Sequence, residues 1–238
     1  MPSLPFVLPG LDIVVEVRRA PTARRLTLRV RSAHRDAVLT VPARTSLGAA
    51  RAFAERHVDW LRERLARLPE PVPFVDGAMV PLRGAPHRVV AKPAGRGLAR
   101  TLAGPAGEPT IVVAGPPEHL SRRLTDFLKR EARRDLEVAV AMHAATLDVS
   151  PGKIRLGDAT SRWGSCSPRG GLAFSWRLIL APPHVLDYLA AHEVAHRREM
   201  NHGPRFWATV ARLRPDYELS EAWLRAHGAG LHRYGAEA

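Results

Sequence analysis

The feature that most constrains this sequence is a helical stripe that ends in two histidines. Val185, Leu189, His192 and His196 fall at positions i, i+4, i+7 and i+11, so a helix places all four on one face. A helix with an apolar stripe is stable only when that stripe packs against the rest of a fold. The chain is therefore expected to form a domain around this helix.

The string HEVAH at residues 192–196 has the spacing of a metal site. His192 and His196 are one turn apart, about 6 Å along the helix axis, so both imidazoles can reach one ion. Glu193 is rotated by about 100° from His192, which places its carboxylate beside the ion as a base for a metal-bound water. Imidazole ligands favour zinc over magnesium or calcium, which prefer oxygen.

A third ligand is expected at His202, six residues after His196. Asn201 and Gly203 tolerate a left-handed backbone and Pro204 suits the start of a new helix, so the chain can turn here and bring His202 back to the ion. Glu199 is a weaker candidate ligand because it follows His196 by only three residues. The more remote His227 and His232 rank below both.

Two alternatives do not involve a metal. The histidines could be uninvolved residues on an exposed helix, since HExxH arises by chance on the order of once in thirty such chains. They could instead be buried partners of Glu193, which leaves His202 unexplained. We therefore favour the metal site.

Residues 1–115 are predicted to be a β-rich region with one helix. Leu26–Val30 alternates as a strand and Ala37–Val41 is its partner across a polar turn at residues 32–36. A helix is predicted from an N-cap at Ser46 to about Leu68. Three further strands are expected at Met79–Leu82, Arg88–Ala91 and Thr110–Val113. The Gly/Pro-rich stretch Ala91–Pro109 is predicted to be an exposed loop.

Residues 116–238 have a different residue pattern, which predicts longer helices. A helix is predicted from Pro117 to about Leu147, and strands at Lys153–Leu156 and Gly171–Leu180. The helix with the HEVAH string follows, and a shorter helix is expected to start at Pro204. We place a boundary near residue 115, although the two halves could share one core.

Composition adds little about function. The net charge of +13 invites a nucleic-acid interpretation, but 33 of the 36 basic residues are arginine and they are scattered, as on a solvated basic surface. The single cysteine, Cys166, cannot form an internal disulfide. No apolar run approaches the roughly 20 residues of a membrane span, and the proline-broken N-terminus is a poor secretory signal. We expect a cytoplasmic protein with no membrane partner.

The segment Arg162–Trp207 resembles the YgjP-like metallopeptidases, bacterial and archaeal relatives of the SprT and WLM zinc proteases. The resemblance rests on Trp163-Gly164-Ser165-Cys166, on the string His192–His196, and on Asn201-His202 leading to Phe206-Trp207. Upstream, ARRLTLRV and the helix ending in WLRERL resemble the N-terminal region of that family. The resemblance is strong from Arg162 to Trp207 and loose before Pro116.

This resemblance implies an α+β, zincin-like fold, with a small sheet beside the helix that bears the ligands. It also implies zinc-dependent peptide hydrolysis, in which His192, His196 and His202 are ligands of Zn²⁺ and Glu193 is the catalytic base. Glu199 stands where the related HExxHxxGxxH proteases have glycine, so the turn to His202 must be made differently here.

Other candidate residues remain open. An oxyanion stabiliser is needed, and four residues are candidates for it: Tyr217, His227, His232 and Tyr234. The strand Gly171–Leu180 is a candidate edge for an extended peptide. Asp187 and Asp216 could accept hydrogen bonds from ligand histidines. Cys166 is interpreted as a packed thiol rather than a nucleophile.

The sequence thus predicts a zinc-dependent metallopeptidase that acts on a peptide or protein through a water activated by Glu193. The alternative is a basic zinc protein associated with nucleic acid, either a protease recruited to protein–DNA complexes or a binder that does not cleave. A degenerate zincin that holds metal and peptide without cleaving is a third hypothesis. The sequence does not indicate the oligomeric state.

Overall fold

The computed structural model describes residues 5–11, 13–31 and 35–236, and the chain divides into two compact units, Met1–Glu70 and Pro71–Ala238. The predicted boundary near residue 115 lies inside the second unit. The strands before it and the helices after it bury their apolar residues in one core, as Val80, Val89 and Ile111 do with Leu124 and Leu136.

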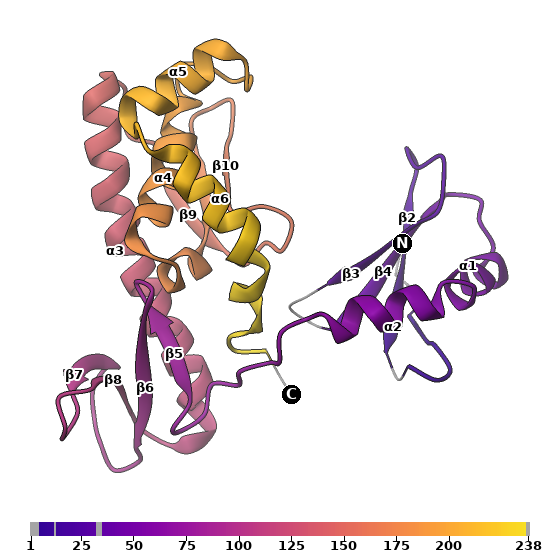
Figure 1. Ribbon diagram of the computed structural model, residues 1–238, viewed down its shortest axis with the longest axis horizontal. Coiled ribbons are helices and arrows are strands. Elements are labelled where there is room, and N and C mark those ends of the chain that lie inside the picture. The colour runs from indigo at the N-terminus through magenta and orange to yellow at the C-terminus, as the bar shows by residue number, and fades with distance from the viewer. Residues whose placement is uncertain (1–4, 12, 32–34, 237–238) are drawn as a thin grey trace. The chain divides into compact units, whose positions relative to one another are not determined.

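The first unit is a four-stranded sheet covered by two short helices (Figure 1). Its strand order is β1-β2-β4-β3, with β2 and β4 parallel and the β3–β4 and β1–β2 pairs antiparallel. Its elements are β1 (Phe6–Val7), β2 (Val14–Ala20), β3 (Thr27–Arg31), β4 (Asp36–Pro42), α1 (Leu47–Glu55) and α2 (Val58–Ala66). The predicted pairing of the strands before and after residues 32–36 is confirmed, with Leu28 opposite Leu39. The turn between them includes residues 32–34, which lie outside the described residues.

The helix predicted after Ser46 is two helices rather than one. Ser46 is the N-cap of α1, and its side chain accepts a hydrogen bond from the Ala49 amide. At His57 the ring Nδ1 bonds the Phe53 carbonyl at 2.8 Å, and the backbone amide of His57 turns to Ala54 instead. In a continuous helix the Phe53 carbonyl would accept a hydrogen bond from the His57 amide. The His57 ring takes the place of that amide, and the helix is interrupted there.

The second unit contains two small sheets and one long helix. One sheet has the order β5-β6-β8-β7 and the other β10-β11-β9. Their strands are β5 (Met79–Leu82), β6 (Ala85–Lys92), β7 (Arg100–Ala103), β8 (Pro109–Ala114), β9 (Ile154–Gly157), β10 (Gly164–Cys166) and β11 (Leu172–Ser175). The predicted loop Ala91–Pro109 therefore contains a strand, β7. All its residues are exposed, so no apolar alternation marked it, and it is held by pairing with β8.

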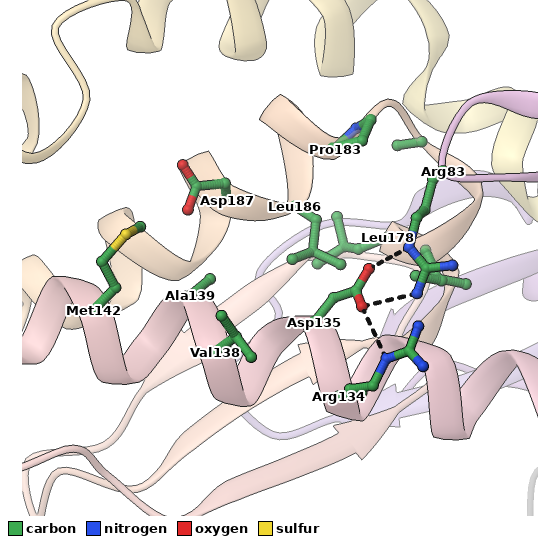
Figure 2. A pocket seen from close by; sticks show the side chains of 12 residues that line it. Arg83, Arg134, Asp135, Val138, Ala139, Met142, Leu178, Pro183, Leu186 and Asp187 are labelled. Carbon is green, nitrogen blue, oxygen red and sulfur yellow. Dashed lines mark hydrogen bonds and ion pairs between the residues drawn. The ribbon is translucent and has the colours of Figure 1, made fainter.

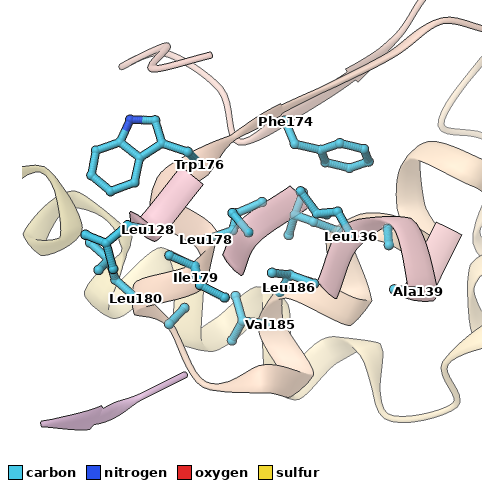
Figure 3. Close-up of a cluster of buried hydrophobic side chains, with 14 of the residues drawn as sticks. Leu128, Leu136, Ala139, Phe174, Trp176, Leu178, Ile179, Leu180, Val185 and Leu186 are labelled. Carbon is cyan, nitrogen blue, oxygen red and sulfur yellow. The ribbon is translucent and has the colours of Figure 1, made fainter. Parts of the chain in front are cut away.

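The helices of this unit pack around α4, which contacts α3, α5 and α6 (Figure 1). They are η1 (Pro117–His119), α3 (Leu120–Leu147), η2 (Trp176–Leu180), α4 (Pro183–Ala195), α5 (Pro204–Leu213), α6 (Tyr217–His227) and η3 (Gly228–Arg233). Leu128 and Leu136 of α3 lie in one buried cluster with Val185 and Leu186 of α4 (Figure 3). None of the helices in the described part of the chain has the length and hydropathy of a membrane span.

The predicted strand Gly171–Leu180 is correct only in its first half. After Ser175 the chain forms η2, where the Ser175 side chain accepts a hydrogen bond from the Arg177 amide. Residues 176–180 are all buried, and a strand of such a small sheet would not bury every successive side chain. The mixed α+β class and the small sheet beside the helix with the HEVAH string are confirmed, as in a zincin-like fold.

Candidate metal centre

The helix α4 fixes two histidines because it is packed on nearly all sides. Val185, Ala190, Val194 and Ala195 are fully buried, and Pro182 and Pro183 form its N-terminal end. His192 lies in its last turn, and His196 is its C-cap residue. A helix held this firmly allows its imidazoles little freedom to move.

The structure brings His192, His196 and His202 together. Their candidate ligand nitrogens lie within 4.8 Å of one another, and the His192 and His202 Nε2 atoms are 3.1 Å apart. His202 is exposed and His196 is buried, so one side of the cluster is open to solvent. Glu199, His227 and His232 are not members of the cluster.

The turn to His202 is made without a left-handed residue. The amides of Arg197 and Glu199 bond back to Val194 and Ala195, which closes the end of α4. Gly203 is extended, with φ −84° and ψ −176°, and caps α5 directly before Pro204. The expected left-handed conformation at Asn201 or Gly203 is therefore absent, since neither residue has a positive φ.

Hydrogen bonds orient two of the imidazoles. The ring Nδ1 of His196 donates to the Glu199 carbonyl at 3.0 Å, and His192 Nδ1 lies 3.5 Å from the Tyr188 hydroxyl. Both contacts leave Nε2 of the ring free to act as a ligand. Asp187 and Asp216, the predicted acceptors, do not serve here, because both carboxylates bond Arg214 and Asp187 also bonds His143.

The three imidazoles are a donor set that binds metal ions, and one pair of their nitrogens has the spacing of a tetrahedral site. At metal–nitrogen distances of 2.0–2.1 Å, two ligand nitrogens of such an ion lie about 3.3 Å apart, close to the His192–His202 separation. Burial and the neighbouring histidines lower the pKa of His192 to about 3, and burial lowers the pKa of His196 as well. Neutral imidazoles are the form that binds metal, so both residues are ready to ligate at neutral pH.

Glu193 lies beside the cluster with an unsatisfied carboxylate. The residue is 4% exposed, and its Oε2 atom is buried without a hydrogen-bond partner among the described residues. Burial raises its pKa to about 7, although the charge of Arg162 acts in the opposite direction. A carboxylate with such a pKa can both accept and release a proton near neutral pH.

A cavity of about 370 Å³ opens onto this carboxylate. His192, Glu193 and Gly164 line it together with Tyr188 and Arg225. The predicted oxyanion stabilisers Tyr217, His227, His232 and Tyr234 do not line it. The Tyr217 ring stacks on Trp207 and the His232 ring on Trp163.

Sequence reasoning missed Tyr188 and Arg225 as residues of the site. Tyr188 precedes His192 by four residues, so the helical spacing that paired the histidines could have found it. Arg225 reaches the cavity from α6, and no sequence signal links that helix to α4.

Cys166 is packed against the core, as expected. Burial and the nearby Glu193 raise the pKa of its thiol, although Arg197 acts in the opposite direction. A thiol with a raised pKa is a poor nucleophile.

A more apolar pocket, of about 330 Å³, lies between α3 and α4 but contains no comparable chemistry (Figure 2). Val138, Met142 and Leu186 line it. Two arginines line it, and both are paired: Arg83 bonds Asp135 and Glu131, and Arg134 bonds Glu131.

A comparison with protein-family models supports a metallopeptidase. A family model for the YgjP-like metallopeptidase domain matches residues 24–227. A comparison with curated proteins gives no match. Among solved structures, the chain is similar to the metallopeptidase zymogen abylysin of Pyrococcus abyssi. The identity is 20%, the match covers 39% of this chain and 92% of that chain, and the TM-score is 0.35.

Proposed function

The chain belongs to the YgjP-like metallopeptidase family, and we propose that it is a zinc-dependent peptidase with Glu193 as its general base. In this proposal His192, His196 and His202 hold the zinc ion. The observation that carries it is the convergence of these three imidazoles beside a buried, unpartnered carboxylate. Three imidazole donors with one open side form the ligand set of a catalytic zinc site.

Glu193 moves the proton in the proposed reaction. When bound, zinc lowers the pKa of a water molecule towards about 7 and polarises the scissile carbonyl. The Glu193 carboxylate accepts the proton of the attacking water, with Oε2 as the free oxygen, and then donates it to the nitrogen of the leaving amine. The packing that holds Glu193 keeps this carboxylate at a fixed distance from the histidines.

The strand β10 is the proposed docking edge for the substrate backbone. The expected edge, Gly171–Leu180, is not one, because β11 lies between β10 and β9. In contrast, β11 is the one strand that pairs with β10 among the described residues, and the first residue of β10, Gly164, lies against Glu193. An extended peptide added to β10 would therefore present a peptide bond to the base.

Metal content and peptide hydrolysis test the proposal together. We expect the wild-type protein to hold one zinc ion and to cleave a mixed peptide library. Glu193→Gln is expected to hold zinc equally well and to lose hydrolysis by at least about a hundredfold, because the base is removed. His202→Ala is expected to lose zinc, whereas the control His227→Ala, outside the cluster, is expected to keep both properties.

Two results would contradict the proposal. Retained hydrolysis by Glu193→Gln would exclude this residue as the base. Zinc binding by the wild type with no cleavage of any peptide would instead favour a zinc protein that binds without cleaving.

A further inference from the structure

A large cleft beside the histidine cluster is lined by cations and by no carboxylate. Its volume is about 710 Å³, within the range of ligand sites. Its cationic side chains are Lys153, Arg155, Arg162, Arg169 and Arg197.

The five cationic side chains are not paired with carboxylates in the described part of the chain, and Glu193 is affected by Arg162 only through its charge. None of their side chains forms an ion pair or hydrogen bond in the described part of the chain, and the Nε atom of Arg197 is buried without a partner. Some other arginines of the unit are paired, as Arg177 is with Asp158 and Arg214 with Asp187. Like charges gathered in a concave surface repel one another and concentrate an anionic ligand.

The cleft adjoins the proposed reaction site along β10. Gly164 lines the cavity that holds Glu193, and the next two residues of the same strand, Ser165 and Cys166, line the cationic cleft. Arg197 directly follows His196, and the charge of Arg162 reaches Glu193 and counteracts the rise in its pKa. A peptide on the edge of β10 would thus extend from the base into the cleft.

We propose that this cleft binds acidic side chains of the substrate on one side of the scissile bond. The inference rests on the proposed function and adds a substrate class, peptides with Asp or Glu within a few residues of the cleavage site. Nucleic acid is the less favoured occupant. No aromatic ring on which a base could stack lines the cleft.

Binding measured without turnover tests the inference first. The protein is the full chain with Glu193→Gln, loaded with zinc, and the probe is a fluorescein-labelled peptide with four glutamates. A matched peptide has serines instead of glutamates. We expect the glutamate peptide to bind at least about tenfold more tightly, and the difference to shrink as salt is raised.

Charge reversal at the cleft is expected to remove that difference. Arg155→Glu with Arg169→Glu should weaken binding of the glutamate peptide by about tenfold or more and leave the serine peptide unchanged. The control, Arg96→Glu with Arg100→Glu, makes the same charge change at exposed residues of the same unit outside the cleft. It should leave both affinities within about twofold.

Equal binding of the two peptides, or equal losses in the two double variants, would overturn the inference. The inference would also be overturned if a labelled single-stranded oligonucleotide bound more tightly than the glutamate peptide, and if Arg155→Glu with Arg169→Glu removed that binding.

Cleavage-site profiling with the active protein separates the two proposals. We expect Asp and Glu to be enriched on one side of the cut sites of a peptide library, and the enrichment to vanish in the cleft variant. Cleavage without such enrichment rejects only the substrate class. If no peptide is cleaved, the proposed function fails, and the binding result still decides whether the cleft recognises acidic peptides.

Discussion

Gly164 occupies a position in β10 where any side chain would meet the carboxylate of Glu193. A Cβ atom at this position would lie against Oε1 and 2.8 Å from Cγ of Glu193. Both contacts are closer than real Cβ atoms approach, so the glutamate would have to shift. The glycine therefore sets how closely β10 and the Glu193 side chain can approach each other.

We expect Gly164→Ala to impair hydrolysis without affecting the metal site. A displacement of the base by about 1 Å is enough to reduce turnover on the order of a hundredfold. Zinc content should stay at the wild-type level, since the three histidines are not moved. The measurements are the turnover of a peptide substrate and the zinc content of the purified variant.

Gly157→Ala is the matched control for this substitution. Gly157 ends β9 in the same sheet, and a Cβ atom there meets nothing within 4 Å. Hydrolysis by Gly164→Ala at the rate of the control would show that Glu193 tolerates the shift.

At the same scale, the sequence predicted the histidine cluster because its chemistry is local. Two ligands one helical turn apart and a third six residues later need only a helix and a turn. The environment of Glu193 was not predictable in this way, because Gly164, Arg162 and Arg225 come from segments distant in the sequence. Helical periodicity carries no information about such partners.

Among the elements, Asp187 joins three helical segments. Its carboxylate bonds His143 of α3 at 2.8 Å and Arg214, directly after α5, at 2.8 Å. Burial acts to raise its pKa, but the bonds with His143 and Arg214 outweigh that effect and hold the pKa below its ordinary value. This side chain, predicted to support a ligand, instead fixes α4 between its neighbours.

Asp187→Asn is expected to destabilise the protein in a pH-dependent way. Because the folded pKa is lowered, the stabilising effect of the carboxylate is complete above the ordinary pKa of 3.8 and is lost as the pH falls through the folded value. We expect a penalty of about 3 kcal/mol at pH 7 that decreases below about pH 4. Urea unfolding of both proteins across this pH range measures it, and a penalty independent of pH would contradict the argument.

Regular elements were predicted where one local signal dominated. The N-cap of α1, the strand pair β3–β4 and the long helix α3 follow from a capping serine, alternation and helical spacing. The break at His57 and the change from β11 to η2 were missed, because each depends on a side chain that bonds the backbone. Such bonds compete with secondary structure and leave the apolar pattern unchanged.

At the scale of the whole molecule, the change from strand-like to helical residue patterns near residue 115 does not coincide with the boundary between the two compact units. The sheet of β5 to β8 lies before that point, yet its buried residues join the core of α3 and α4. The division at Glu70 follows the end of α2 and lies among Pro69, Pro71 and Pro73. The residue pattern changes where the chain passes from strands to helices. Whether those strands and helices share a core depends on how they pack, which the composition of the sequence does not indicate.

The second unit is therefore expected to fold and bind zinc alone. Residues 71–238 contain the whole histidine cluster, Glu193 and the cationic cleft, and their largest core includes no residue of the first unit. A segment with its own core is the usual unit of cooperative folding. A fragment of these residues should unfold in one transition by circular dichroism and bind one zinc ion. The fragment with His202→Ala should fold but lose the metal. If the fragment does not unfold cooperatively while the full chain does, the first unit contributes to the stability of the second.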